Sequence, residues 1–490
     1  MPISYAQDLT DALRYGSSNV LGTARYRGMA GAFGALGGDL SAIHDNPAGS
    51  SVFTSSFGSL TLGSSNQQNE IFYANDIVLE NDTNWNLNQF GAILLYETEG
   101  EEKKVNKIAV GFSYHQTADH RNSYQAIGRT NNSVNQYFLE QANGIPLNQL
   151  ELQQGQNFDR AYADAGENQG FGFQQALLGY EALLFDASDP EDSGNTSYVS
   201  NTGQGSFDQD YLLESSGISG VLTFNVSGEF FNSLYLGANL NSHFIGYNRN
   251  TSFLETNQNS TGSIREIDFR NSLRTNGSGV SAQVGAIYKF ANLRFGLSVD
   301  TPTILLLQDE TTHSIDAFSS ADGDIRVAPN VINTFPEYQI VTPGKVSGSI
   351  AFLFGTAGLI SMDYSYQDFT DLEFDSDEGV DFSVLNNQIE DTFRESGSFK
   401  VGGEYRIGNW SYRAGYSYTE SPYQDERLLG DRTGVALGLG YSYGKWRFDM
   451  AYDSFFQDRD EQFYPNSGFS NSAFIENYTT NLTFTLGLHL

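Results

Sequence analysis

Apolar and polar residues alternate along the last part of the chain. Between 478 and 490, tyrosine, phenylalanine and leucine alternate with threonine, asparagine, glycine and histidine. Because successive side chains of a β-strand point to opposite faces, such a strand has one apolar and one polar face. The pattern returns at 410–418 and 445–453, where the polar face also carries Arg413 and Asp449. In a membrane barrel, charges of this kind face a wet lumen while the aromatic residues face lipid.

About fourteen such segments follow residue 51, an even number of the kind that bacterial outer-membrane barrels use. The connections between them alternate between short and long, as periplasmic turns and extracellular loops do. With even parity, both termini are expected in the periplasm. We therefore predict an all-β fold, an antiparallel transmembrane β-barrel. The expected strands are 52–62, 86–96, 107–116, 217–227, 234–244, 280–290, 293–301, 345–354, 359–369, 399–407, 410–419, 433–443, 445–455 and 478–490.

The longest expected extracellular loop, 118–216, contains a helical pattern at 171–185 and a weaker one at 135–143. An amphipathic helix in such a loop must bury its apolar face. It can pack onto the loop's own core, or it can form one wall of an apolar ligand groove. For the groove, we select the candidate ligand-binding residues on local chemistry alone: Phe171, Phe173, Leu177, Leu184 and Phe185.

The N-terminal region has a different composition. Seven glycines lie between Leu21 and Gly49, a density that is costly in regular helices and strands. Such a segment suits a chain that turns tightly and packs its backbone against surrounding walls. We predict a remnant of a signal peptide at 1–6, a plug at 7–50 and the barrel at 51–490. The plug residues that we single out are Gly28, Gly31, Gly34, Gly37, Gly38, Asn46, Pro47 and Ala48.

The net charge and the lack of cysteine limit the classes of partner and site that we expect. The formal net charge is −33, which argues against nucleic acid as a partner, and there is no cysteine for a disulfide or a thiolate metal site. Against this acidic background, Arg14, Arg25 and Arg27 of the plug could pair with lumen acids such as Asp363 or Asp449. We state this pairing as a hypothesis from charge and strand parity.

No motif predicts catalysis. The segment 440–444 matches the G-x-S-x-G nucleophile pattern, but it lies between two expected strands, whereas that motif needs a strand, a sharp turn and a helix. The six histidines form no compact metal-binding set, and the plug glycines match no nucleotide-binding loop. We therefore expect no enzyme activity and no cofactor.

The residues also resemble a known family. A glycine-rich plug at 24–39, followed by Asn46-Pro47-Ala48-Gly49 and a fourteen-stranded barrel, is similar to the FadL-type outer-membrane transporters of hydrophobic compounds. The segments 400–406 and 413–416, with 421–423, resemble members from the Bacteroidetes. The resemblance implies a plug, called the hatch, that carries the Asn-Pro-Ala motif. It also implies a ligand path from a loop groove through the lumen, with release by hatch movement.

Two functions follow from this resemblance. The first is passive uptake of hydrophobic small molecules across the outer membrane of a Gram-negative cell, with long-chain fatty-acid-like ligands and membrane lipid as partners. The alternative is an interaction protein, like the PorV barrel of the type IX secretion system. Its partners would be secreted or other outer-membrane proteins, and the helix-bearing loop would be the docking surface.

Overall fold

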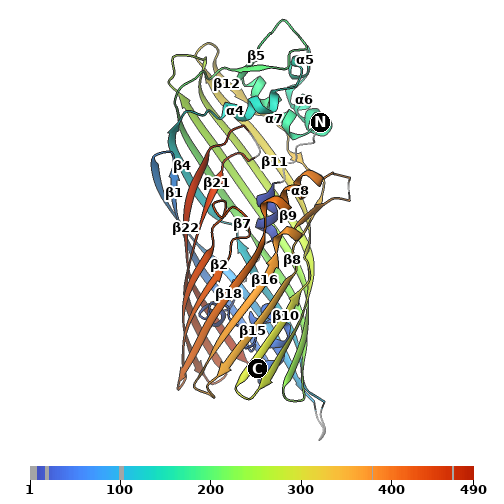
Figure 1. Ribbon diagram of the computed structural model, residues 1–490, viewed down its shortest axis with the longest axis vertical. Coiled ribbons are helices and arrows are strands. Elements are labelled where there is room, and N and C mark those ends of the chain that lie inside the picture. Colours follow the sequence, from blue (N-terminus) through green and yellow to red (C-terminus); the bar gives the residue numbers. More distant parts are fainter. Residues whose placement is uncertain (1–7, 17–20, 99–103, 378, 466–467) are drawn as a thin grey trace.

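Fourteen antiparallel strands close into a barrel in the computed structural model, which describes residues 8–16, 21–98, 104–377, 379–465 and 468–490 (Figure 1). Closure is made by the first and last strands, which pair from Phe57 opposite His489 to Phe72 opposite Phe474. The barrel strands are β1 (Phe57–Tyr73), β2 (Asp76–Glu97), β3 (Val105–Asp119), β7 (Phe207–Phe230), β8 (Leu234–Asn257), β9 (Ile264–Phe290), β10 (Leu293–Asp300), β15 (Lys345–Leu353), β16 (Gly358–Asp368), β18 (Glu395–Ile407), β19 (Trp410–Thr419), β20 (Arg432–Tyr443), β21 (Trp446–Gln462) and β22 (Ser472–His489).

Each expected strand overlaps one of these fourteen in the expected order, which confirms the fold class. The first strand begins at Phe57 rather than at Val52, because Pro47–Val52 forms a 3-10 helix, η1. None of the described helices is long and apolar enough to cross a membrane.

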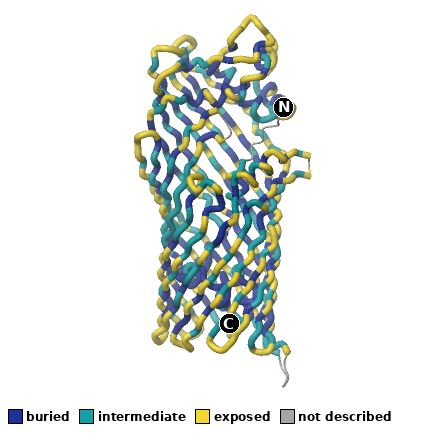
Figure 2. The backbone as a smooth tube through the Cα atoms, viewed as in Figure 1, coloured by how far each residue is buried: buried dark blue, intermediate teal, exposed yellow. Residues whose placement is uncertain are grey.

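Exposure alternates along the barrel strands as the sequence pattern predicts (Figure 2). On β21, the outward Phe448 and Tyr452 are exposed, whereas Asp449 and Asp453 between and beside them are buried in the lumen. The buried acids are tolerated because they are paired, as described below.

Several strands extend well beyond the expected segments. The expected loop 63–85 is a hairpin in which β1 and β2 stay paired up to Tyr73 opposite Asp76. Likewise, β8 and β9 continue through most of the expected loop 247–279. In the β8–β9 extension most outward side chains are polar, among them Asn250, Ser252 and Arg270, so it lacks the outward apolar stripe by which the sequence reveals a membrane strand.

The end of the barrel with short turns, which we call the turn end, lies at the bottom of Figure 1. The opposite end, the loop end, carries the longer connections. Its smaller strands are β4 (Asn122–Thr130), β5 (Phe185–Ala187), β6 (Tyr198–Ser200), β11 (Ile304–Ser319), β12 (Gly323–Val327), β13 (Asn333–Thr334), β14 (Tyr338–Val341) and β17 (Glu373–Asp375), beside the short 3-10 helix η2 (Phe369–Asp371).

Helices cover part of the loop end. The two expected helical pieces correspond to α7 (Phe171–Glu181) and α4 (Asn135–Ala142). Three further helices, α5 (Leu147–Leu150), α6 (Phe158–Gln169) and α8 (Ser383–Thr392), were not expected. The stretch 118–216 is thus not one loop, since β3 ends at Asp119, β4 follows, and β7 begins at Phe207.

The N-terminal segment lies inside the barrel (Figure 1). It forms α1 (Leu9–Gly16), α2 (Ala24–Arg27), α3 (Ala42–Asp45) and η1. We call residues 21–52 the hatch. The signal-peptide remnant predicted at 1–6 lies outside the described residues.

Candidate ligand cavity and hatch

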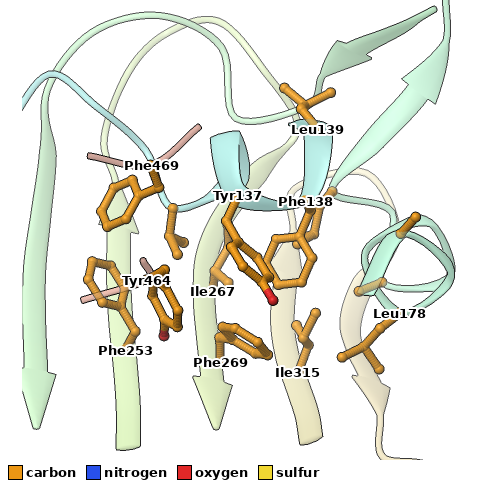
Figure 3. Close-up of a cluster of buried hydrophobic side chains, with 14 of the residues drawn as sticks. Tyr137, Phe138, Leu139, Leu178, Phe253, Ile267, Phe269, Ile315, Tyr464 and Phe469 are labelled. Carbon is orange, nitrogen blue, oxygen red and sulfur yellow. The ribbon is translucent and has the colours of Figure 1, made fainter. Parts of the chain in front are cut away.

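A cavity of about 1170 Å³ lies in the loop-end half of the barrel. Its aromatic walls come from distant parts of the chain: Tyr137 of α4, Phe171 of α7, Tyr211 of β7, Phe269 of β9, and Phe463 with Tyr464 after β21. In Figure 3, Tyr137 lies under α4 beside Phe269 and Tyr464. The ring centre of Tyr137 is 5.7 Å from that of Phe269 and 5.1 Å from that of Tyr464. The cavity therefore offers a broad apolar surface of interlocked rings.

The cavity wall carries charges of both signs, namely Arg14, Arg249, Arg432 and Arg459 together with Asp8, Asp381, Glu420, Asp460 and Glu461. Arg249 of β8 and Arg432 of β20 both line it. Among the described residues, neither has a carboxylate within 4.0 Å. The Arg432 guanidinium instead lies 4.0 Å from the ring centre of Phe455. An aromatic cavity with available guanidinium groups suits an amphiphile with an acidic head.

The structure separates the five candidate ligand-binding residues. Phe171 lines the cavity. The other four are buried in a hydrophobic core that the loop helices share with the strand ends, and they are absent from the cavity wall: Phe173, Leu177, Leu184 and Phe185. Phe173 and Leu177 face inward because α7 packs closely on α4, with room at Gly179 only for a hydrogen beside the Phe138 ring. Leu184 and Phe185 follow α7 and are fully buried in the same core. Of the two alternatives for the helix, these four residues follow the first: they pack in the core of the loop and do not line a ligand groove.

Most of the cavity's aromatic residues were missed by sequence reasoning. Phe269 and Arg249 lie on strand extensions that were expected to be loop, and Tyr464 lies in a connection with no periodic pattern. Among the missed residues, only Tyr137 lies in an expected helix. The alternation of Ile267, Phe269 and Leu273 with polar neighbours is the feature that could have revealed the extension of β9.

Helix α1 forms part of the cavity floor. Arg14 pairs with Asp11 within the helix, and its guanidinium lies 4.6 Å from the ring centre of Tyr247. Burial and the nearby Asp8 raise the pKa of Asp11 to about 7, although Arg14 opposes this shift. Arg14 also lines a second chamber of about 150 Å³, which lies between α1 and the hatch and is walled by polar residues such as His243 and Lys400.

Asn46 of the predicted motif ties the hatch to itself and to the barrel. Its side-chain oxygen accepts from the backbone N–H of Ala48 at 3.1 Å and so caps η1, whose first residue is Pro47. Its amide group donates to the carbonyl oxygens of Gly34 at 2.8 Å and of Ala286 on β9 at 3.1 Å. An Asn-Pro pair suits this place, because proline needs no donor at the start of a helix and asparagine supplies the cap.

The hatch glycines allow close backbone contact with the barrel. A Cβ at Gly28 would lie 2.9 Å from the Cα of Gly438 on β20, and one at Gly34 would collide with Ser349. Gly31, Gly37 and Gly38 have positive φ, and a Cβ at Gly37 would lie 2.7 Å from the Cα of Gly49. These positions account for the glycine density as tight turning and close packing.

Buried ion pairs hold the hatch from the lumen side. The Arg27 guanidinium donates to both carboxylate oxygens of Asp453, at 2.7 and 2.6 Å. Arg25 pairs with Glu404 at 3.1 Å. The hypothesis of plug arginines paired with lumen acids thus holds for these two, with acids other than those suggested. Arg14 pairs within α1, and Asp363 accepts instead from the backbone N–H of Gly34 at 2.8 Å.

The barrel wall has a seam between β2 and β3. Their ladder ends at Gln89 opposite His115, and β3 then bulges between Gln116 and Ala118. Beyond that point, polar side chains replace the ladder: Asn86 of β2 donates to Asp119 of β3 at 2.7 Å, and Asn69 of β1 donates to Asn122 of β4 at 2.9 Å. Thr117 and Ala118 of the bulge line the second chamber, and Leu21 of the hatch donates its N–H to the carbonyl of Gln116 at 2.9 Å.

No group of three or more potential metal ligands occurs among the described residues. The G-x-S-x-G segment at 440–444 spans the end of β20 and the turn into β21, so it lacks the strand-to-helix elbow that the nucleophile motif requires.

Comparisons with known proteins agree with this architecture. The crystal structure of a Pseudomonas aeruginosa FadL homologue matches with a TM-score of 0.54 at 13% identity, over 96% of this chain and 98% of that chain. The P. putida toluene transporter TodX matches at 0.53 and 12% identity, over 96% and 99%. The Ralstonia pickettii toluene transporter TbuX matches at 0.50 and 13% identity, again over 96% and 99%. These likenesses show the fold.

Sequence comparison supplies the family. No curated protein sequence matches the chain significantly. The family model described as outer membrane protein transport protein (OMPP1/FadL/TodX) matches residues 193–485, which is more than half of the 490 residues. The chain is therefore a member of the OMPP1/FadL/TodX family of outer-membrane transport proteins.

Proposed function

We propose that this protein is a passive channel for hydrophobic molecules that carry an acidic head, such as long-chain fatty acids. The observation that carries the proposal is the cavity in which an aromatic wall faces Arg249 and Arg432. Bare hydrocarbons, such as the toluene named for TodX and TbuX, would use the wall but not the arginines. In this proposal the loop end faces the cell exterior and both chain termini lie on the periplasmic side.

The physical reason for such a channel is the cost of exposing a chain to water. Each CH₂ group moved from water to an apolar site gains about 0.8 kcal/mol. A relay of apolar sites can therefore carry an amphiphile across a polar surface layer without chemistry. Shielding the carboxylate with a guanidinium removes the remaining obstacle, the burial of an unpaired charge.

Binding of palmitate and of hexadecanol to the protein in neutral-lipid nanodiscs, counted by native mass spectrometry, tests the cavity. Losing a charge-assisted hydrogen bond costs about 1.5 kcal/mol, so Arg249→Gln should weaken palmitate binding roughly tenfold. Hexadecanol binding should stay unchanged. The matched control is Arg160→Gln, whose side chain on α6 is 82% exposed. Equal loss of both ligands in Arg249→Gln would contradict a head-group role, and an empty wild-type protein would contradict the channel.

We further propose that the ligand leaves sideways through the seam between β2 and β3. The second chamber reaches the bulge at Thr117 and Ala118. Above it, among the described residues, side-chain hydrogen bonds rather than a backbone ladder join β2 to β3 and β4. The hydrogen bond from Leu21 to Gln116 links the start of the hatch to this bulge. A shift of the hatch would therefore loosen the seam.

Because the chain has no cysteine, a disulfide can lock the seam specifically. Asn86→Cys with Asp119→Cys should block palmitate uptake when oxidised and restore it when reduced, while palmitate binding persists. The control pair, Asn66→Cys with Thr83→Cys, joins directly opposite residues of the continuous β1–β2 ladder and should leave uptake unchanged. Normal uptake through the oxidised seam variant would exclude this route.

A further inference from the structure

A third chamber, of about 260 Å³, lies between the hatch and the turn end. It shares no lining residue with the second chamber on the other side of the hatch. Four arginines line it: Arg25 from the hatch, Arg294 from β10, Arg406 from β18 and Arg447 from β21. The transport path described above does not use this chamber.

Two carboxylates form ion pairs with four guanidinium groups around this chamber. Glu404 pairs with Arg25 at 3.1 Å, with Arg413 at 2.6 Å and with Arg406. Asp449 pairs with Arg413 at 2.7 Å and with Arg447 at 2.8 Å. Both acids and Arg413 are almost fully buried, so water screens these charges poorly.

Arg294 adds a fifth guanidinium. Its terminal nitrogen donates to the carbonyl of Leu36 at 2.6 Å, and among the described residues no carboxylate lies within 4.0 Å of it. Its Nε is buried and has no hydrogen-bond acceptor among those residues. The other acid on the wall, Asp39, accepts from Thr23 at 2.7 Å and from the N–H of Ser41 at 2.9 Å.

The balance of the chamber is therefore positive. Five arginines (Arg25, Arg294, Arg406, Arg413, Arg447) face three acids (Glu404, Asp449, Asp39), which leaves 5 − 3 = +2. The whole chain carries −33, so the chamber opposes the overall charge. A concave, poorly screened site with excess guanidinium groups attracts small oxyanions.

We propose that this chamber binds an oxyanion, a carboxylate or a phosphate group, beneath the hatch. Two sources share this chemistry. One is the carboxylate of the transported amphiphile, for cargo that passes the hatch instead of leaving at the seam, a source that rests on the proposed function. The other is phosphate from the aqueous compartment, which does not depend on it. In either case, the anion accepts from Arg294 and Arg406, whose guanidinium groups lie at the rim of the ion-pair network.

Titration calorimetry of the detergent-solubilised protein with inorganic phosphate, in a buffer of low ionic strength, tests the site directly. Wild type should bind one phosphate, with an affinity that falls as salt is added. Arg294→Gln should weaken binding about tenfold, since a charge-assisted hydrogen bond is lost. Arg406→Gln gives a second test that spares the hatch, because its side chain is 42% exposed and Glu404 keeps Arg25 and Arg413.

Arg129→Gln is the control, since that arginine pairs with Asp208 on an exposed part of the loop end. Absence of phosphate binding, or equal binding by wild type and both chamber variants, would overturn the proposal. Decanoate added to the phosphate complex distinguishes the sources: displacement identifies the cargo carboxylate, and retention identifies free anion. The phosphate measurement uses no hydrophobic ligand, so its failure would leave the transport proposal intact.

Discussion

The barrel is partly covered at its loop end and is plugged by the hatch, and these two regions are held by opposite chemistry. The loop-end cap, by which we mean residues 131–206, is held to the strand ends by apolar packing. Its Tyr137 and Phe138 are in mutual ring contact with Phe269 of β9. The hatch is held by directional polar contacts, among them the Arg27–Asp453 ion pair and the hydrogen bonds that the side-chain amide of Asn46 donates. Apolar packing tolerates rearrangement and can yield to a hydrophobic ligand. A network of buried ion pairs is destabilised when only some of its pairs form, because each buried charge left without its partner raises the free energy of the folded state.

In the proposed transport function, this difference would give the cap and the hatch separate roles. The cap offers a surface whose energy depends on area, so cargo of varied shape can replace one set of contacts by another. The hatch, by contrast, is suited to a two-state closure, either seated with all its pairs formed or displaced. Selectivity for cargo would then come from the cavity, and tightness of the barrel from the hatch.

The largest effect is expected from breaking the hatch anchor. Asp453→Asn leaves the Arg27 guanidinium buried without its carboxylate, and breaking such a pair costs about 3–5 kcal/mol. The hatch should then leave its seat part of the time. We expect frequent current steps in planar bilayers where wild type is closed, and greater sensitivity of cells to large polar antibiotics.

The control for this experiment is Asp208→Asn, which removes a similar bidentate partner from Arg129 at an exposed site. Surface pairs contribute about 0–1 kcal/mol, so this variant should remain closed. If Asp453→Asn is as tight as wild type, the ion pairs are not what seats the hatch, and the glycine contacts must carry the closure.

The two closures also differ in how far the sequence predicts them. Strand alternation located the barrel because lipid demands an apolar face, and the glycine density marked the hatch because its backbone packs against walls such as Gly438. The partner of Arg27 could not be identified. Strand parity places many acids in the lumen. Only the strand register of the folded barrel brings Asp453, 426 residues away in the sequence, into contact with Arg27.

The ligand cavity was harder to predict for a related reason. Phe171 and Phe173 stand two residues apart on α7, yet one lines the cavity and the other is buried in the core. An apolar helix face shows that something covers it, but not whether protein or ligand does. The covering parts of β8 and β9, moreover, are polar on the outward face, so they were expected to be loop and their inward aromatic residues were not assigned to a wall.

The last prediction compares Phe171 on α7 with Phe185 on β5 and separates core from cavity within the cap; its effect on ligand binding is the smallest. Phe185→Ala removes a fully buried ring and should loosen the cap, because truncating a buried phenylalanine costs about 3–5 kcal/mol. Phe171→Ala removes only one side of the cavity wall, where the ring lies 5.3 Å from that of His313. It should weaken palmitate binding by about 1–2 kcal/mol while the cap stays folded.

Protease protection of residues 131–206 reports on the cap, and native mass spectrometry reports on binding. If Phe171→Ala exposes the cap to protease as Phe185→Ala does, the wall and the core are one structural unit. The cavity could not then adapt to cargo independently of the fold.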